Sequence, residues 1–211
     1  MKKAIFDMDG LIFDSERIFM RELGIVMEEY GYTLTREHYI STIGITVSAV
    51  EQIKRKEFGA DYPHEEISKK AAQRLTKLAH EGKLPIKKGI QNLLEELTAR
   101  GISCVVASST DTEYVCEYLR TAGLDKYFDN IIGGDKVKGS KPDPDIFIAA
   151  LDGTAPEDAL VLEDSINGVK AAHNAHIPVI CIPDMVYPDE HTRSLALAVV
   201  DSADDVAPYI F

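Results

Sequence analysis

The stretch that decides the fold is Ala4-Ile5-Phe6-Asp7-Met8-Asp9-Gly10, in which two carboxylates follow a short apolar run. Successive side chains of a strand alternate between its faces, so Asp7 and Asp9 point to the same side. Like charges at that separation repel, and a fold accommodates them with a cation near them. Gly10 then lets the backbone leave the strand sharply. The stretch predicts a site for a hard cation such as Mg²⁺, with a phosphate as its partner.

The rest of the chain predicts the sheet to which this first strand belongs. Strands are expected at residues 3–7, 103–107, 130–132, 159–162, 178–182 and 198–200, and helices between them at 91–99, 112–122, 145–151 and 167–175. Strands with continuous apolar runs that alternate with helices are typical of a parallel sheet covered on both faces. We therefore expect an α/β fold with a Rossmann-like parallel sheet core.

Residues 17 to about 83 interrupt this alternation. Helical patterns occupy 18–30, 36–43, 47–58 and 65–81, and none of the segment resembles a strand. We predict an inserted all-helical cap domain at 16–83, and an α/β core domain made of 1–15 and 84–211. Such a lid would expel bulk water from a phosphoryl-transfer site and select the substrate.

Composition narrows the possible partners. Among 211 residues the formal net charge is −12, which disfavours nucleic acid or an anionic membrane surface as a partner. No apolar run is long enough to span a bilayer. Of the three cysteines, Cys104 and Cys181 lie in predicted buried strands and Cys116 does not, so we expect reduced thiols in a cytoplasmic protein. We also expect a monomer, because no long apolar surface stripe is evident.

Polar residues follow three of the predicted strands, at the edge where an α/β sheet places its site. Ser108-Ser109-Thr110 opens a helix and predicts a phosphate cradle, although Ser and Thr also cap helices without binding anything. Lys141 lies in a turn stiffened by Pro142, where it is either a phosphate-binding cation or a solvated side chain. Glu163 and Asp164 end another strand, and they complete an oxygen cage for Mg²⁺ with Asp7 and Asp9.

These motifs together resemble a known family. Asp7-Met8-Asp9-Gly10, Ser108, Lys141-Pro142 and Glu163-Asp164 occur in the order and spacing of the haloacid-dehalogenase superfamily, and the helical insert resembles its β-phosphoglucomutase-like branch. The resemblance covers essentially the whole chain. It implies a phosphatase that hydrolyses small phosphomonoesters, such as sugar phosphates, rather than a dehalogenase, because halide release needs no acid at Asp9.

The resemblance also implies a role for each residue. Asp7 would be the nucleophile that forms an aspartyl-phosphate, and Asp9 the general acid and then the general base. Ser108, Ser109 and Lys141 would bind the transferring phosphoryl group, with Lys141 neutralising its charge. Mg²⁺ would be held by Asp7, by the backbone carbonyl of Asp9 and by Asp164, with Glu163 beside them or just outside.

Two alternatives remain. A phosphomutase of this branch would carry a His and an Arg in the lid, where this chain has Phe19 and Val47, so hydrolysis is favoured. A non-catalytic protein that binds a phosphorylated metabolite is disfavoured because every group needed for turnover is present. The lid histidines His38, His64 and His80 lack metal-ligand spacing and are interpreted as surface residues.

Overall fold

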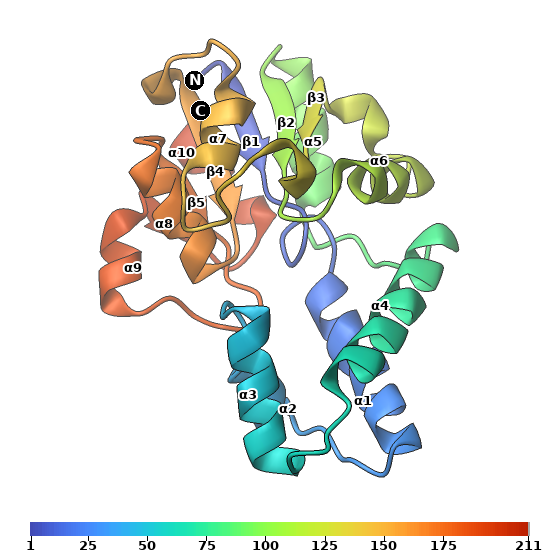
Figure 1. Cartoon of the computed structure of the whole chain (residues 1–211). Helices are drawn as coiled ribbons and strands as arrows, with labels where there is room; N and C mark the ends of the chain where they lie inside the picture. Colours follow the sequence, from blue (N-terminus) through green and yellow to red (C-terminus); the bar gives the residue numbers. More distant parts are fainter. Residues whose placement is uncertain (211) are drawn as a thin grey trace.

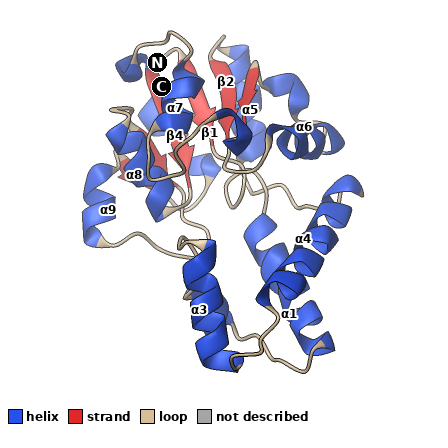
Figure 2. Ribbon diagram, viewed as in Figure 1, coloured by secondary structure: helices blue, strands red, loops and turns tan. Residues whose placement is uncertain are grey.

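The sheet forms the centre of the computed structural model, which describes residues 1–210. Its six strands are all parallel and lie in the order β3-β2-β1-β4-β5-β6. The three central strands, β2, β1 and β4, are labelled in Figure 2. They are β1 (Lys3–Phe6), β2 (Ser103–Ala107), β3 (Asn130–Ile132), β4 (Ala159–Glu163), β5 (Val179–Cys181) and β6 (Ala198–Val199). The Rossmann-like parallel sheet predicted from the sequence is confirmed, with strand ends that differ by a residue or two.

Helices cover both faces of this sheet, as predicted. Ile5 and Phe6 are adjacent in β1 and point to opposite faces of the sheet, so they belong to different hydrophobic clusters. The cluster of Phe6 includes residues of α5 (Ile90–Ala99) and α6 (Thr112–Thr121), and that of Ile5 includes residues of α7 (Asp145–Leu151) and α8 (Ile166–Asn174). The short helices α9 (Glu190–Leu195) and α10 (Ala207–Ile210) had no predicted counterpart.

A helical insert follows β1 and lies below the sheet in Figure 1. It comprises α1 (Ser15–Glu29), α2 (Arg36–Ile40), α3 (Val47–Phe58) and α4 (His64–His80), of which α1 and α4 pack together. The insert has its own hydrophobic cluster, which includes Leu23, Met27, Tyr62 and Ile67. Residues 16–83 contain no strand. The division into a core domain (1–15 and 84–211) and a cap domain (16–83) remains a prediction.

The two chain segments that connect the sheet to the insert run side by side. The amide of Asp14 donates to the carbonyl of Pro85 over 2.9 Å, and the amide of Lys87 donates to the carbonyl of Ile12 over 2.8 Å. The carboxylate of Asp184, only 1% exposed, accepts hydrogen bonds from the side chains of both Arg17 and Lys87. A single buried carboxylate, that of Asp184, therefore binds a residue next to each connecting segment and holds the two together.

The structure tests the expectations about the cysteines and about one histidine. Cys104 and Cys181 are buried thiols, and Cys116 is exposed. One expectation was wrong: His64 is 9% exposed and buried, because α4 turns its first residue toward the interior of the insert instead of toward solvent. Among the described residues, no helix has the length and apolar character that a membrane crossing requires.

Candidate active site

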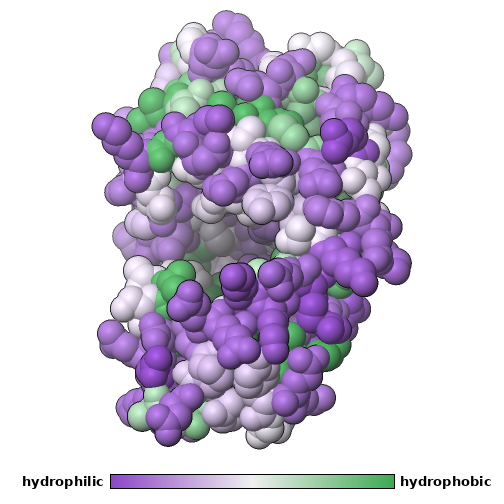
Figure 3. Space-filling view, turned by 45° about the vertical axis from the view of Figure 1, so that its right-hand side comes forward, coloured by the Kyte–Doolittle hydropathy of each residue, from purple (hydrophilic) through white to green (hydrophobic). Residues whose placement is uncertain are grey.

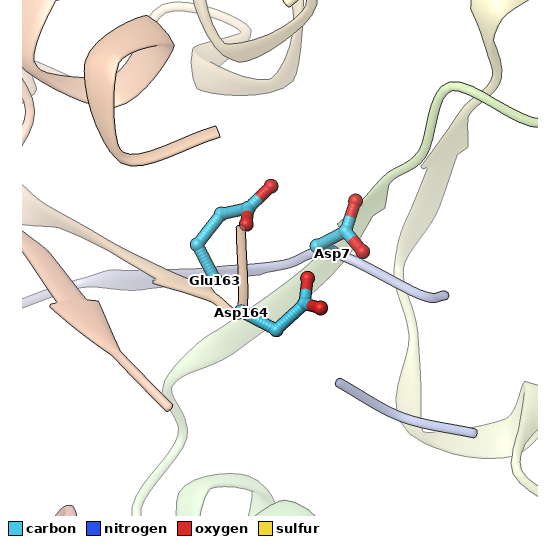
Figure 4. Close-up of side chains that lie close together, drawn as sticks. All are labelled: Asp7, Glu163 and Asp164. Carbon is cyan, nitrogen blue, oxygen red and sulfur yellow. The ribbon is translucent and has the colours of Figure 1, made fainter. Parts of the chain in front are cut away.

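Asp7 lies at the carboxyl end of the central strand. Phe6 of β1 is in register with Leu162 of β4, and the amide of Asp7 continues the ladder by donating to the Leu162 carbonyl over 3.0 Å. This register brings the residue after β1 beside the end of β4. Asp7, Glu163 and Asp164 consequently converge (Figure 4), and each offers a carboxylate oxygen within 4.8 Å of the others.

Lys141 reaches into this cluster from the loop before α7. Its ammonium lies 2.5 Å from Oδ1 of Asp7 and 2.6 Å from Oε1 of Glu163, and its side chain is only 8% exposed. Burial works against the charged form, but the two carboxylates outweigh it and raise the pKa of Lys141 above its usual range. Lys141 is therefore a fixed cation between Asp7 and Glu163, as the rigid turn had suggested.

Glu163 is held in place from the opposite side. Its Oε2 accepts hydrogen bonds from the backbone amide of Ser165 over 2.7 Å and from the Ser165 hydroxyl over 3.0 Å. Gly168 on α8 provides the room, because a Cβ at that position would lie 1.7 Å from Oε1 of Glu163. The side chain thus bridges Lys141 and the first turn of α8.

The cluster contains more negative charge than Lys141 balances. Burial raises the pKa of Asp7 to about 7; Lys141 counteracts this rise, whereas Glu163 and Asp9 add to it. Burial, followed by repulsion from Glu163 and Asp7, also holds the pKa of Asp164 well above its usual range. Three carboxylates and one ammonium leave an excess of two negative charges when all are ionised, and a divalent cation would neutralise this excess.

The geometry around Asp164 also fits a metal. Gly10 has φ +82°, and a Cβ there would lie 2.2 Å from Oδ2 of Asp164. A glycine at position 10 therefore allows Asp164 to approach the end of β1. The donor atoms available are carboxylate oxygens, which are the ligands that Mg²⁺ prefers. Asp7, Glu163 and Asp164 therefore fit a Mg²⁺ site.

Asp9 points to a different set of partners. Its Oδ1 accepts a hydrogen bond from the Ser15 hydroxyl over 2.8 Å, and its Oδ2 accepts one from the Thr110 hydroxyl over 2.8 Å. Its carboxylate is not part of the cluster of Asp7, Glu163 and Asp164. The assignment of Asp9 to the metal, through its backbone carbonyl, thus remains a prediction. The carboxylate itself is oriented by hydroxyls, which suits a group that exchanges protons.

The two serines after β2 have different environments. Ser108 is 1% exposed, and its hydroxyl accepts the amide of Thr110 over 3.1 Å and lies 3.5 Å from Oδ2 of Asp9. Ser109 is exposed and lines the cavity beside Lys141. The hydroxyl of Ser108 thus caps the loop, and Ser109 lines the cavity; phosphate binding by these two serines remains a prediction.

These side chains surround one cavity between the sheet edge and the helical insert (Figure 3). Its volume is about 300 Å³, and its walls include Asp7, Asp9, Ser109 and Lys141. The predicted site residues other than the buried Ser108 all line it.

Sequence reasoning missed two other acids in this wall, Glu16 on α1 and Asp184 after β5. Glu16 lies six residues after Gly10 of the first motif, yet an acid in the first turn of a helix is common and gives no distinct signal. Asp184 follows a predicted strand, but no motif distinguishes it from an ordinary loop residue.

Comparisons with known proteins agree with this geometry. The sequence model of the family described as "Haloacid dehalogenase-like hydrolase" matches residues 4–182. Phosphorylated carbohydrates phosphatase of Thermotoga maritima is 32% identical over 179 residues, which are 84% of this chain and 82% of that protein. Hexitol phosphatase B of Escherichia coli is 28% identical over 184 residues, with 85% and 82% covered. The structure of CbbY from Rhodobacter sphaeroides in complex with phosphate is similar at a TM-score of 0.79 and 28% identity, covering 98% of this chain and 96% of that one.

Proposed function

Because the chain belongs to the haloacid dehalogenase-like hydrolases and is a phosphoric monoester hydrolase, we propose that it is a Mg²⁺-dependent phosphatase of small sugar phosphates. The family resemblance predicted from the motifs is thereby confirmed. The observation that carries the proposal is the buried cluster in which Lys141 binds Asp7 and Glu163, with Asp9 beside it in the same cavity.

Asp7 is the nucleophile in this proposal. Lys141 holds Oδ1 of Asp7, whereas Oδ2 accepts no hydrogen bond from the described residues and is available to attack phosphorus. Attack forms an aspartyl-phosphate and breaks the bond to the leaving alcohol. Lys141 offsets the charge of the transferring phosphoryl group, and Ser108 and Ser109 help to bind it.

Asp9 handles the proton in both steps. In the first step it donates a proton to the oxygen of the leaving alcohol, and in the second it takes one from the water that hydrolyses the aspartyl-phosphate. The hydroxyls of Ser15 and Thr110, each 2.8 Å from one carboxylate oxygen, hold Asp9 in orientation. This support leaves the carboxylate in the cavity wall, where a substrate would bind.

The metal would be held by Asp7, Glu163 and Asp164, the three acids whose oxygens converge. When bound, Mg²⁺ supplies charge neutralisation for these carboxylates and for a dianionic phosphate. The relatives include a phosphorylated carbohydrates phosphatase and a hexitol phosphatase, which supports a phosphorylated sugar or sugar alcohol as the substrate class.

Hydrolysis is favoured over phosphate migration by the side chains of the cap. Phe19 packs in the insert with its ring centroid 6.3 Å from that of Tyr39, and Val47 is 76% exposed. Neither residue is the His or the Arg that a phosphomutase of this branch would carry at that position. Phosphate would therefore pass to water instead of returning to the sugar.

Phosphate release from a panel of sugar phosphates, measured with Mg²⁺ and with EDTA, tests this function. We expect release with Mg²⁺, its loss in EDTA, and no release by the Asp7→Asn variant. Products should also be examined for migrated phosphate. An isomerised sugar phosphate without net release would overturn the hydrolase assignment in favour of a mutase, and full activity of Asp7→Asn would remove Asp7 as the nucleophile.

A further inference from the structure

A second cavity lies inside the helical insert, next to the active-site cavity. Its volume is about 240 Å³, and it is enclosed by residues of all four cap helices, including Phe19, Tyr39, Lys54 and His64. Three residues, Glu16, Ile43 and Gly44, line both cavities. The two cavities therefore adjoin, and a molecule bound at Asp7 has room to extend into the insert.

Lys54 is a buried cation in the wall of this cavity. It is 2% exposed, and among the described residues no carboxylate lies within 4.0 Å of its ammonium. The carbonyl of His38, 3.5 Å away, is its hydrogen-bond acceptor, and the ring of Phe58 lies 5.4 Å from the ammonium. Glu57 is the neighbouring acid, but its carboxylate lies 2.5 Å from Nε2 of His38. Within the described part of the chain Lys54 thus forms no close ion pair, and Glu57 acts on it only at longer range.

His64 adds a second unused polar group to the same wall. It is 9% exposed, and its Nδ1 is buried without a hydrogen-bond partner among residues 1–210. Burial lowers the pKa of His64 and so favours the neutral imidazole, whose N–H can lie on either nitrogen. A ligand oxygen in the cavity would satisfy it.

Burial of these two groups is costly unless something pairs with them. A lysine that merely covers apolar surface keeps its ammonium in water, and Lys54 does not. An unpaired buried charge destabilises a fold, and burial accordingly lowers the pKa of Lys54. The wall includes the aromatic side chains of Phe19, Tyr39 and Tyr62, so an anion bound beside Lys54 would be partly shielded from water and more strongly attracted than in bulk solvent.

We propose that this cavity is a subsite for a second anionic group, a carboxylate or a second phosphate, carried by the leaving group of the substrate and bound by Lys54 and His64. The proposal rests on the phosphatase function, because it describes the part of the substrate that the active-site cavity does not hold. The preferred substrates are then phosphorylated sugars or sugar acids with an anion at the far end from the scissile phosphate.

The junction between the cavities fits the middle of such a molecule. Glu16 lines both, and its Oε2 accepts the hydroxyl of Tyr39 over 2.6 Å. Burial raises the pKa of Glu16, although the bond from Tyr39 opposes this. The carboxyl group can hydrogen-bond to sugar hydroxyls on the path between the two anionic ends.

Binding to the Asp7→Asn protein, in which the nucleophile is absent, tests the subsite without requiring turnover. Calorimetric titration with Mg²⁺ would compare fructose 1,6-bisphosphate with fructose 6-phosphate, and 6-phosphogluconate with glucose 6-phosphate. The first pair differs by a second phosphate, and the second by a carboxylate. We expect at least one anion-bearing member to bind ten-fold or more tightly than its partner, and the pair that shows this identifies the anion.

Variants then assign the preference to Lys54. Lys54→Met should abolish the preference for the anion-bearing ligand, with little change in the affinity for the neutral-ended one. Lys54→Arg should retain part of this preference. Lys56→Met, at an exposed lysine of the same helix, should leave it intact. Lys54→Met should also raise the melting temperature of the free protein, which a structural lysine would not do. Equal binding within both pairs, or an undiminished preference in Lys54→Met, would overturn the subsite. Loss of the phosphatase function would instead appear as absent turnover by the wild-type protein on every substrate.

Discussion

Gly168→Ala is a small change with a large expected effect, because it acts on Glu163. The new methyl group would lie 1.7 Å from Oε1 and 1.9 Å from Cδ of Glu163, so the side chain must leave its position. Its contact with Lys141 at 2.6 Å and its bonds from Ser165 would then be lost. Breaking a buried pair in this way costs about 3–5 kcal/mol.

The substitution also stabilises helix α8 itself, and this gain in stability must be subtracted from the loss. Gly168 lies on α8, and alanine is favoured over glycine in a helix by about 1 kcal/mol. The expected net loss in the free energy of unfolding is therefore about 2–4 kcal/mol. Phosphate release should fall by two orders of magnitude or more, because Lys141 and the metal ligands shift together.

Gly24→Ala is the matched control for this prediction. Gly24 lies on α1, and a Cβ there would meet no atom within 4 Å. The free energy of unfolding of this variant should therefore rise by up to about 1 kcal/mol, when both variants are measured by urea titration. Phosphate release by Gly24→Ala should remain at the wild-type level. If Gly168→Ala matched Gly24→Ala in stability and activity, the account of how Glu163 is held would be refuted.

Three further predictions concern other parts of the site. Mg²⁺ should raise the melting temperature of the wild-type protein and EDTA should abolish the gain, since the metal offsets the excess charge of the buried acids; a melting temperature insensitive to Mg²⁺ would contradict the site. Asp9→Asn should slow phosphate release by about 10²–10⁴-fold with little change in the denaturation midpoint, and an unchanged rate would remove Asp9 as the acid and base. Asp184→Asn should free Arg17 and Lys87 together, so we expect a lower melting temperature and faster proteolysis between residues 80 and 90, and wild-type resistance would argue against the fastening role.

The sheet and its acids were predictable from the sequence for a common reason. Parallel strands bring their carboxyl ends to one edge, so the residues that follow each strand must be neighbours once the strands are recognised. Asp7 and Glu163 meet because β1 and β4 pair in register, and this needs no knowledge of side-chain packing. The contact between Lys141 and both acids was less certain, since a loop residue is placed by the backbone around it.

Partners formed between the core and the insert were harder to predict. Asp184 binds Arg17 and Lys87, which are distant in sequence and lie close together because the two segments that connect the sheet to the insert are adjacent. No periodicity or motif in the sequence predicts such a contact. Glu16 was likewise indistinguishable from an ordinary acid in the first turn of a helix, although it lines both cavities.

Lys54 did carry a signal in the sequence. It lies four residues after Val50 and four before Phe58, so the three share one face of α3. Val50 and Lys54 both line the cap cavity, and Phe58 belongs to the apolar cluster of the insert. A lysine in the middle of an apolar stripe contradicts the usual separation of polar and apolar faces, and such contradictions concentrate at functional sites. Comparison of each charged residue with the apolar face of its own helix therefore singles out Lys54 from the sequence alone.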